Sequence, residues 1–127
     1  MIDRTGLSLI GSSNLAGVNL EGTPRLLIRT GGWKDHSRFP ETIPVLAEDV
    51  PAYLAERGVI LVGLDVPSMD VLDSKMLPVH HALARHGIAI LESLDLSNVP
   101  EGVYELIALP LKLVGADGSP VRAVLRS

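Results

Sequence analysis

Twice in this chain, a short helix-like segment ends at a glycine and an apolar run begins at once. The first unit runs from residue 49 to residue 64 around Gly58, and the second from residue 78 to residue 91 around Gly87. Glycine adopts the left-handed conformation that ends helices, and a short apolar run after it indicates a buried strand. The two units predict an α/β domain in which helices alternate with strands.

Local signals support both helices. In the first, Asp49 is expected to cap the helix and Pro51 is tolerated in its first turn. The second is expected to open at Pro78, with Val79 and Leu83 on one side. We expect the first to span residues 49–57 and the second to close at the following glycine.

Other segments extend this prediction to a mixed sheet. The apolar run at residues 25–30 and the run at 103–109 are typical of strands. Residues 111–114 and 121–125 flank a Gly-Ala-Asp-Gly turn signal and are expected to form a hairpin. Residues 1–24 are poorly defined, and we expect a loop with one short helix there.

Composition narrows the class of protein. A chain of 127 residues with 46% hydrophobic and 20% charged residues suits a single globular domain, residues 1–127. A net charge of −4 without clustered Lys and Arg argues against a nucleic-acid partner. The apolar runs are too short for a membrane span, and no signal-peptide stretch opens the chain. We expect a soluble, cytoplasmic protein.

Without cysteine, any metal must be held by His, Asp or Glu. His80 lies near the start of the second predicted helix, and Glu92 ends the apolar run that follows. The return from helix to strand can bring them together, and an imidazole with a carboxylate suits zinc or manganese. By spacing alone, two ordinary surface residues explain the pattern as well. His36, His81 and His86 are expected to be solvated or packing residues.

Substrate-pocket candidates follow two predicted strands, because ligands of open α/β sheets bind at the carboxyl ends of strands. They are Trp33, Asp65 and Ser68. Trp33 could contact an aromatic ring, as could Phe39, or be ordinary packing. Asp65 could instead bond backbone amides, and Ser68 lacks the glycine context of a serine nucleophile. No residue is assigned as the catalytic acid or base.

Four stretches together resemble successive blocks of one enzyme family. They are RLLIRTGGW (25–33), LAERGVILVGLDVPSMD (54–70), HHALARHGIAILESL (80–94) and VYELIALPLKLVGADGSPVRAVL (103–125). In this order they resemble the cyclase family of metal-dependent amidohydrolases, most closely the bacterial kynurenine formamidases (arylformamidases). The resemblance runs from about Arg25 to the C-terminus.

This resemblance implies a swivelling β/β/α-type domain, usually dimeric, with a binuclear zinc or manganese site. It implies hydrolysis of N-formyl-L-kynurenine to L-kynurenine and formate in tryptophan breakdown. The family's C-terminal metal ligands have the pattern His-x11-Glu, with the Glu in an Ile-Leu-Glu triplet. His80 and Glu92 match it, so the resemblance implies that both bind metal.

The sequence also departs from the family. The N-terminal motif His-Gly-Thr-His-x-Asp-x-Pro-x-His, which supplies the other ligands and an acid–base candidate, is absent, and the first histidine is His36. We therefore expect a chain truncated at its N-terminus, weakly active or inactive alone, and oligomeric to cover exposed strand edges. The alternatives are a non-catalytic cyclase-like scaffold for assembly or small-molecule binding, or a related amidohydrolase with another substrate.

Overall fold

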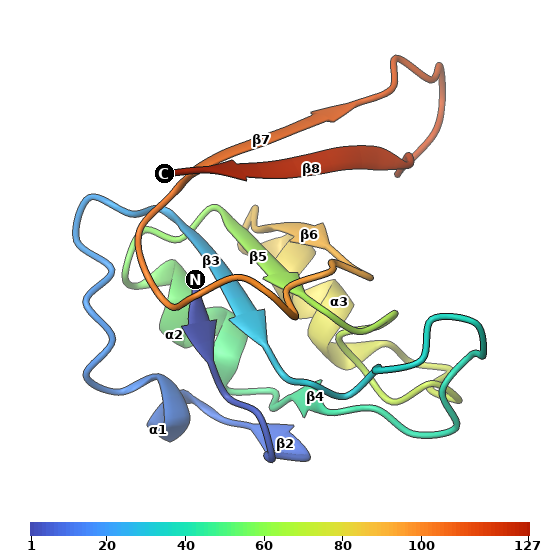
Figure 1. Cartoon of the computed structure of the whole chain (residues 1–127), viewed down its shortest axis with the longest axis horizontal. Helices are drawn as coiled ribbons and strands as arrows, with labels where there is room; N and C mark the ends of the chain where they lie inside the picture. Colours follow the sequence, from blue (N-terminus) through green and yellow to red (C-terminus); the bar gives the residue numbers. More distant parts are fainter.

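A computed structural model describes all residues 1–127 and shows an α/β arrangement of eight strands and three helices (Figure 1). The elements are β1 (Ile2–Asp3), β2 (Leu9–Ile10), α1 (Ser12–Leu15), β3 (Arg25–Arg29), β4 (Val45–Leu46), α2 (Val50–Ala55), β5 (Leu61–Leu64), α3 (Pro78–Arg85), β6 (Ala89–Leu91), β7 (Glu105–Pro110) and β8 (Val121–Arg126). The α/β class predicted from the sequence is confirmed.

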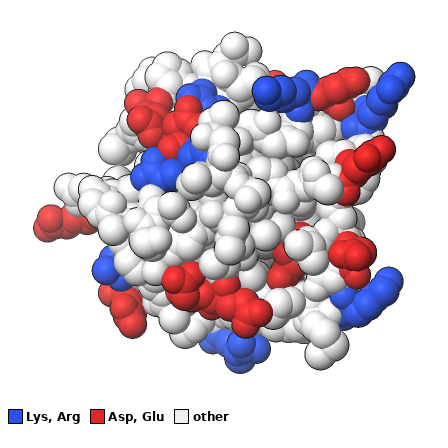
Figure 2. All heavy atoms as spheres, turned by 90° about the horizontal axis from the view of Figure 1, so that it is seen from below, with Lys and Arg blue, Asp and Glu red and all other residues white.

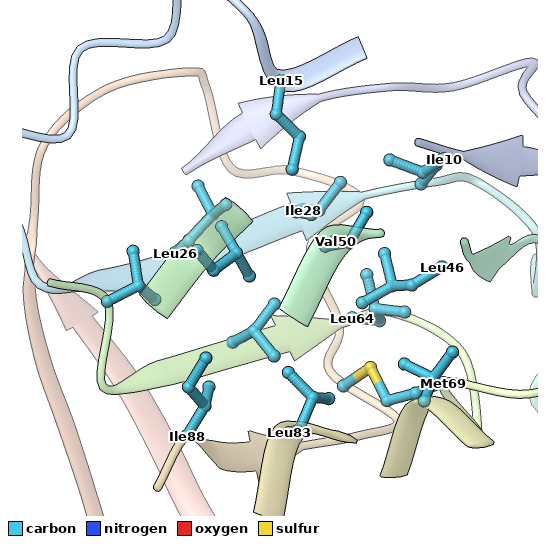
Figure 3. Close-up of a cluster of buried hydrophobic side chains, with 14 of the residues drawn as sticks. Ile10, Leu15, Leu26, Ile28, Leu46, Val50, Leu64, Met69, Leu83 and Ile88 are labelled. Carbon is cyan, nitrogen blue, oxygen red and sulfur yellow. The ribbon is translucent and has the colours of Figure 1, made fainter. Parts of the chain in front are cut away.

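The centre of the molecule is a parallel sheet with the strand order β1-β3-β5-β6. A second parallel pair joins β2 to β4, and an antiparallel pair joins β7 to β8. Parallel and antiparallel pairing are thus both present, as predicted, but they lie in three separate sheets. Helices α2 and α3 contribute to one buried core with the central sheet (Figure 3).

The core is aliphatic, as expected from the low aromatic content. Its buried side chains come from the two parallel sheets, from all three helices and from the segment after β5 (Figure 3). They include Ile10, Leu15, Ile28, Leu46, Val50, Leu54, Val62, Leu64, Met69 and Leu83. Residues 1–24, for which the sequence predicts little, therefore supply two short strands, one helical turn and part of this core.

Both helix–glycine–strand units form. Gly58 and Gly87 have φ values of +71° and +67°. After each glycine, a backbone N–H returns to the helix: Val59 donates to the Leu54 carbonyl at 3.1 Å, and Ile88 donates to the Leu83 carbonyl at 2.9 Å. Glycine reaches this conformation without strain, so both helices end abruptly and their chains turn directly toward the sheet.

The prediction that the Asp49 side chain caps α2 is wrong. Asp49 occupies the N-cap position, but its side chain makes no capping hydrogen bond to α2. Instead, the Asp49 carboxylate accepts from the Ser12 hydroxyl at 2.6 Å and from the Ser12 backbone N–H at 3.2 Å. This contact joins α1 to the start of α2.

The hairpin also differs from its prediction. Strand β8 pairs with β7, from Glu105 opposite Arg126 to Pro110 opposite Val121. Residues 111–114 belong to the connection between the two strands. Proline has no N–H for a ladder and is tolerated at the end of an edge strand, so β7 continues to Pro110 rather than ending before it.

The hairpin lies across the central sheet (Figure 1), and its two faces differ. Along both strands, half-buried and exposed residues alternate. The half-buried face lines two hollows shared with the central sheet. The opposite face carries the exposed apolar side chains of Ile107, Leu109 and Val124.

Arg29 ties the central sheet to the connection that leads to the hairpin. Its guanidinium pairs with Asp3 and donates to the Val99 carbonyl at 2.9 Å. The hydrogen bond from Arg29, with those from Thr5, holds the pKa of Asp3 well below its usual range. Through Arg29, this network fixes both β1 and the segment before the hairpin to β3.

On the face seen in Figure 2, acidic and basic side chains both occur around a largely uncharged centre. None of the three helices has the length and apolarity that crossing a membrane requires.

Candidate metal centre

Three parallel strands of the central sheet end at the same edge. Strand β3 is followed by Thr30, β5 by Asp65 and β6 by Glu92. The carboxyl ends of parallel strands are the usual place for ligands in α/β proteins. Polar side chains from separate parts of the chain converge here.

His80 and Glu92, the two predicted metal ligands, lie side by side at this edge. His80 is in the first turn of α3, and Glu92 directly follows β6. The His80 Nε2 atom is 3.0 Å from Glu92 Oε1, and the two side chains are 26% and 31% exposed. The pair is therefore close enough to act together and open enough to meet a ligand.

The chemistry of this contact requires either a hydrogen or a cation between the two atoms. A carboxylate oxygen only accepts hydrogen bonds, and an imidazole nitrogen without a proton does the same. At 3.0 Å, either a proton on Nε2 or a shared cation must lie between them. Two ligands each about 2.1 Å from one cation lie about 3.0–3.4 Å apart at octahedral to tetrahedral angles. The observed separation thus fits a divalent cation.

Asp70 holds the other side of the His80 ring. Its Oδ2 atom is 2.7 Å from His80 Nδ1. The same carboxylate accepts the backbone N–H groups of Val79 and His80, each at 3.1 Å. Although burial raises the pKa of Asp70, these hydrogen bonds outweigh it and hold the pKa below its usual value. Asp70 therefore stays ionised beside the ring.

Asp70 is a member of the site that was not predicted from the sequence, although a signal for it is present. Pro78 is the first residue of α3 and has no N–H, so the next two N–H groups need acceptors. No Ser, Thr, Asp or Asn occupies residues 75–77. An acceptor from elsewhere in the chain was therefore required, and Asp70 supplies it.

Strained backbone flanks both members of the pair. Leu77 and Ser93 have φ values of +43° and +59°, and they are the only residues other than glycine with positive φ. Leu77 precedes the first turn of α3, which carries His80, and Ser93 directly follows Glu92. A left-handed residue with a side chain costs about 1–2 kcal/mol. Strain of this kind gathers at functional sites.

The chain brings two predicted metal ligands together at this place and no third. No group of three or more His, Asp or Glu side chains is arranged to hold one ion. Asp70 bonds the Nδ1 side of His80, away from Glu92, so it orients the ring rather than joining the pair. A cation bound here would keep several positions for other ligands.

Asp65, a predicted pocket residue, is buried and fully engaged. Its Oδ1 accepts from the Thr30 backbone N–H at 2.8 Å and from the Thr30 hydroxyl at 2.6 Å. Its Oδ2 accepts from the Gly31 N–H at 2.9 Å. The carboxylate thus fixes the turn that leaves β3.

Trp33 and Ser68, the other pocket candidates, lie in the loops after β3 and β5. The Trp33 ring stacks on His36 with centroids 4.6 Å apart, and its Nε1 donates to the carbonyls of Asp35 and Arg38 at 3.0 and 2.8 Å. The Ser68 hydroxyl accepts from the Asp70 N–H at 3.1 Å. Ser68 therefore touches the residue that orients His80.

Asp95, in the segment after Glu92, lines the same hollow as His80 and Glu92. Hydrogen bonds from the Ser97 hydroxyl and N–H hold the pKa of Asp95 below its usual value.

A groove of about 1370 Å³ gives access to the pair. One wall is formed by His80 and residues 89–95, and the other by the tip of the β7–β8 hairpin. A second hollow of about 730 Å³ lies at the base of the hairpin, lined by parts of residues 1–27 and 101–106. His80 and Glu92 face the first hollow only.

Comparison with known proteins identifies what this arrangement resembles. A kynurenine formamidase from Bacillus mycoides is 52% identical over 126 residues, which are 99% of this chain and 60% of that protein. Over almost its whole length, the chain is similar to kynurenine formamidases. A second kynurenine formamidase, from Geobacillus thermodenitrificans, is 56% identical over 117 residues, which are 92% of this chain and 56% of that protein. No family model matches the chain.

Two solved structures share the fold of this chain. A predicted metal-dependent hydrolase from Bacillus stearothermophilus and a potential metal-dependent hydrolase with cyclase activity each have a TM-score of 0.83 and 32% identity. They match 98% of this chain, which covers 60% and 62% of their lengths. The predicted cyclase-family resemblance is confirmed, and it includes residues 1–24. The chain spans about 60% of the length of these relatives.

Proposed function

We propose that this chain carries one part of a divalent metal centre that hydrolyses N-formyl-L-kynurenine to L-kynurenine and formate. The observation that carries the proposal is the 3.0 Å approach of His80 Nε2 to Glu92 Oε1. It occurs in a chain that is 52% identical to a kynurenine formamidase. Zinc and manganese are the proposed ions, because both accept imidazole or carboxylate ligands. A cytoplasmic location, suited to tryptophan breakdown, is part of the proposal.

His80, Glu92 and Asp70 would have different roles at this centre. A divalent cation supplies an activated water and a Lewis acid for the amide carbonyl. His80 offers a nitrogen lone pair to the cation, and Glu92 offers an anionic oxygen that offsets its charge. Asp70 orients the His80 ring, and the groove beside the pair admits the substrate.

The pocket assignments also belong to this proposal. Trp33 would offer an aryl ring the face opposite the one that stacks on His36, because offset stacking between aromatic rings is favourable. Asp65 would shape the pocket by fixing the turn that precedes Trp33. Ser68 would act by holding Asp70, to whose N–H its hydroxyl is bonded.

The isolated chain is expected to release formate from N-formyl-L-kynurenine slowly or not at all, even with added zinc or manganese. Two protein ligands hold a catalytic cation poorly, and the chain offers no further group for the same ion. Adding the part of a relative that lies outside its match with this chain, as a second polypeptide, is expected to raise the rate. The measurement is formate release with time.

A matched pair of variants gives this assay its control. In the mixture of two polypeptides, His80→Ala is expected to remove the gain in rate, and His81→Ala, an exposed neighbour on α3, is expected to leave it. Robust turnover by the isolated chain would show that the catalytic machinery lies elsewhere.

One observation favours a second function, that of a non-catalytic scaffold that binds metal or a small molecule. No three metal-ligating side chains gather in this chain. Metal bound through His80 without turnover, even in the presence of the second polypeptide, would favour the scaffold. Turnover of a cyclic amide in place of N-formyl-L-kynurenine would favour a related amidohydrolase.

We also infer that a second copy of the chain covers the outer face of the hairpin. Leu109 on this face is 76% exposed, and Ile107 and Val124 lie beside it. Exposed apolar patches of this kind mark protein interfaces. Leu109→Glu is expected to give monomers in light scattering at micromolar concentration. Val114→Glu, in the fully exposed connection, is the control and is expected to leave the oligomer intact. A monomeric unsubstituted chain would contradict this inference.

A further inference from the structure

The backbone around Asp70 is anchored in the core. The preceding residue, Met69, is fully buried, and its carbonyl accepts the Leu46 N–H from β4 at 3.1 Å. The Asp70 N–H donates to the Ser68 hydroxyl at 3.1 Å. The Asp70 residue is only 4% exposed. The position of its carboxylate is therefore fixed, and the carboxylate can orient the more exposed His80 ring.

The carboxylate makes two kinds of contact, which can be separated. It caps α3 by accepting the N–H groups of Val79 and His80 at 3.1 Å. It also meets the ring of His80 at Nδ1, at 2.7 Å. The first contact stabilises the helix, whereas the second determines which ring nitrogen carries the proton.

An ionised carboxylate accepts hydrogen bonds and donates none. The neutral His80 ring has one proton for two carboxylates. We expect it on Nδ1, because the Asp70 contact is shorter than the Glu92 contact, 2.7 against 3.0 Å, and the Asp70 side chain is the more buried of the two. The Nε2 lone pair is then open to a cation, and without one the more exposed Glu92 carboxylate is expected to turn toward solvent. Nε2 is the atom that lies 3.0 Å from Glu92 Oε1. The other tautomer would place a hydrogen on Nε2 and close that atom to a cation.

We propose that Asp70 is a positioning residue that holds His80 in the Nδ1–H tautomer, so that Nε2 and Glu92 can bind one divalent cation. This inference rests on the proposed metal-binding function. Carboxylates that bond the far nitrogen of a ligating histidine typically contribute about 10- to 100-fold to metal affinity.

Asp70→Asn separates tautomer control from capping. The side-chain amide keeps one oxygen that can accept the Val79 N–H, but it places an N–H group against Nδ1. The neutral ring must then accept at Nδ1 and carry its proton on Nε2. Asp70→Ser is a second variant, whose hydroxyl can still cap the helix but is too short to reach the ring. Asp73→Asn, an exposed carboxylate of the same segment, is the matched control.

The experiment reads the tautomer directly. Nitrogen-15 shifts of the His80 ring, assigned with His80→Gln, are recorded on the neutral ring of the metal-free chain at alkaline pH. Nδ1–H is expected in the unsubstituted chain and in Asp73→Asn, and Nε2–H in Asp70→Asn. Zinc affinity, measured by competition with a chelator, is expected to fall about 10- to 100-fold in Asp70→Asn and in Asp70→Ser.

An Nδ1–H ring in Asp70→Asn, or zinc affinity within twofold of the unsubstituted chain in both Asp70 variants, would overturn the inference. Failure of the proposed function gives a different result. In that case the unsubstituted chain would bind no zinc, although its His80 tautomer would still depend on Asp70.

Discussion

Replacing His80 by alanine is expected to weaken zinc or manganese binding by about a hundredfold or more. The chain contributes two ligands to the proposed centre, and the substitution leaves the Glu92 carboxylate alone. Loss of a ligand should exceed the 10- to 100-fold effect typical of a residue that only orients one. Titration calorimetry, or competition with a chelating dye, measures the change.

The neighbouring histidine provides the control for this prediction. His81 follows His80 on α3, is exposed, and faces away because successive helix residues point in different directions. His81→Ala is expected to bind metal as the unsubstituted chain does. Equal losses from both substitutions, or binding by His80→Ala within twofold of the unsubstituted chain, would mean that the metal is held elsewhere.

Asp65→Ala is expected to lower the free energy of unfolding by about 2–4 kcal/mol. The substitution leaves the N–H groups of Thr30 and Gly31 and the Thr30 hydroxyl without their shared acceptor. Thr30 is 2% exposed, so water cannot readily replace the carboxylate. A buried donor left unsatisfied costs about 1–3 kcal/mol, and the three losses are not fully additive. Urea denaturation measures the change.

Asp73→Ala is the control for Asp65→Ala, since Asp73 is an exposed carboxylate in the same inter-element segment. It is expected to change the free energy of unfolding by less than about 0.5 kcal/mol. A loss below about 1 kcal/mol for Asp65→Ala would show that the turn after β3 finds other acceptors. Asp65 would then lose its structural role and return to the pocket as a free carboxylate.

The parts of the fold that the sequence predicts well are those with local causes. Gly58 and Gly87 each end a helix through their own backbone conformation, and the apolar runs after them are short enough to read as strands. The contacts of Asp49 and Asp70 were not predictable in this way. Asp49 bonds Ser12 rather than its own helix, and Asp70 caps a helix that begins several residues later.

The pairing of strands in the C-terminal part also could not be predicted from local sequence signals. The turn-forming residues 115–118 suggested that the nearest apolar segment, 111–114, pairs with β8, whereas the long connection allows β7 to pair instead. The strands of residues 1–24 have two residues each, which is too short for any periodic pattern. Both features depend on partners that are distant in the sequence.

At the candidate site, residue chemistry alone could not decide whether His80 and Glu92 are metal ligands or ordinary surface residues. The family resemblance favoured the first interpretation. The structure adds that the two side chains converge at 3.0 Å, although they belong to different elements. The role of the pair in binding metal stays a prediction, as do the pocket roles of Trp33, Asp65 and Ser68.

Crystals of this chain grown with zinc or manganese would test the shared cation most directly. An anomalous difference map at the absorption edge of the metal locates the ion without reference to activity. We expect one peak about 2.1 Å from both His80 Nε2 and Glu92 Oε1, with Asp70 still bonded to Nδ1. A peak away from this pair, or none at millimolar metal, would contradict the proposed centre.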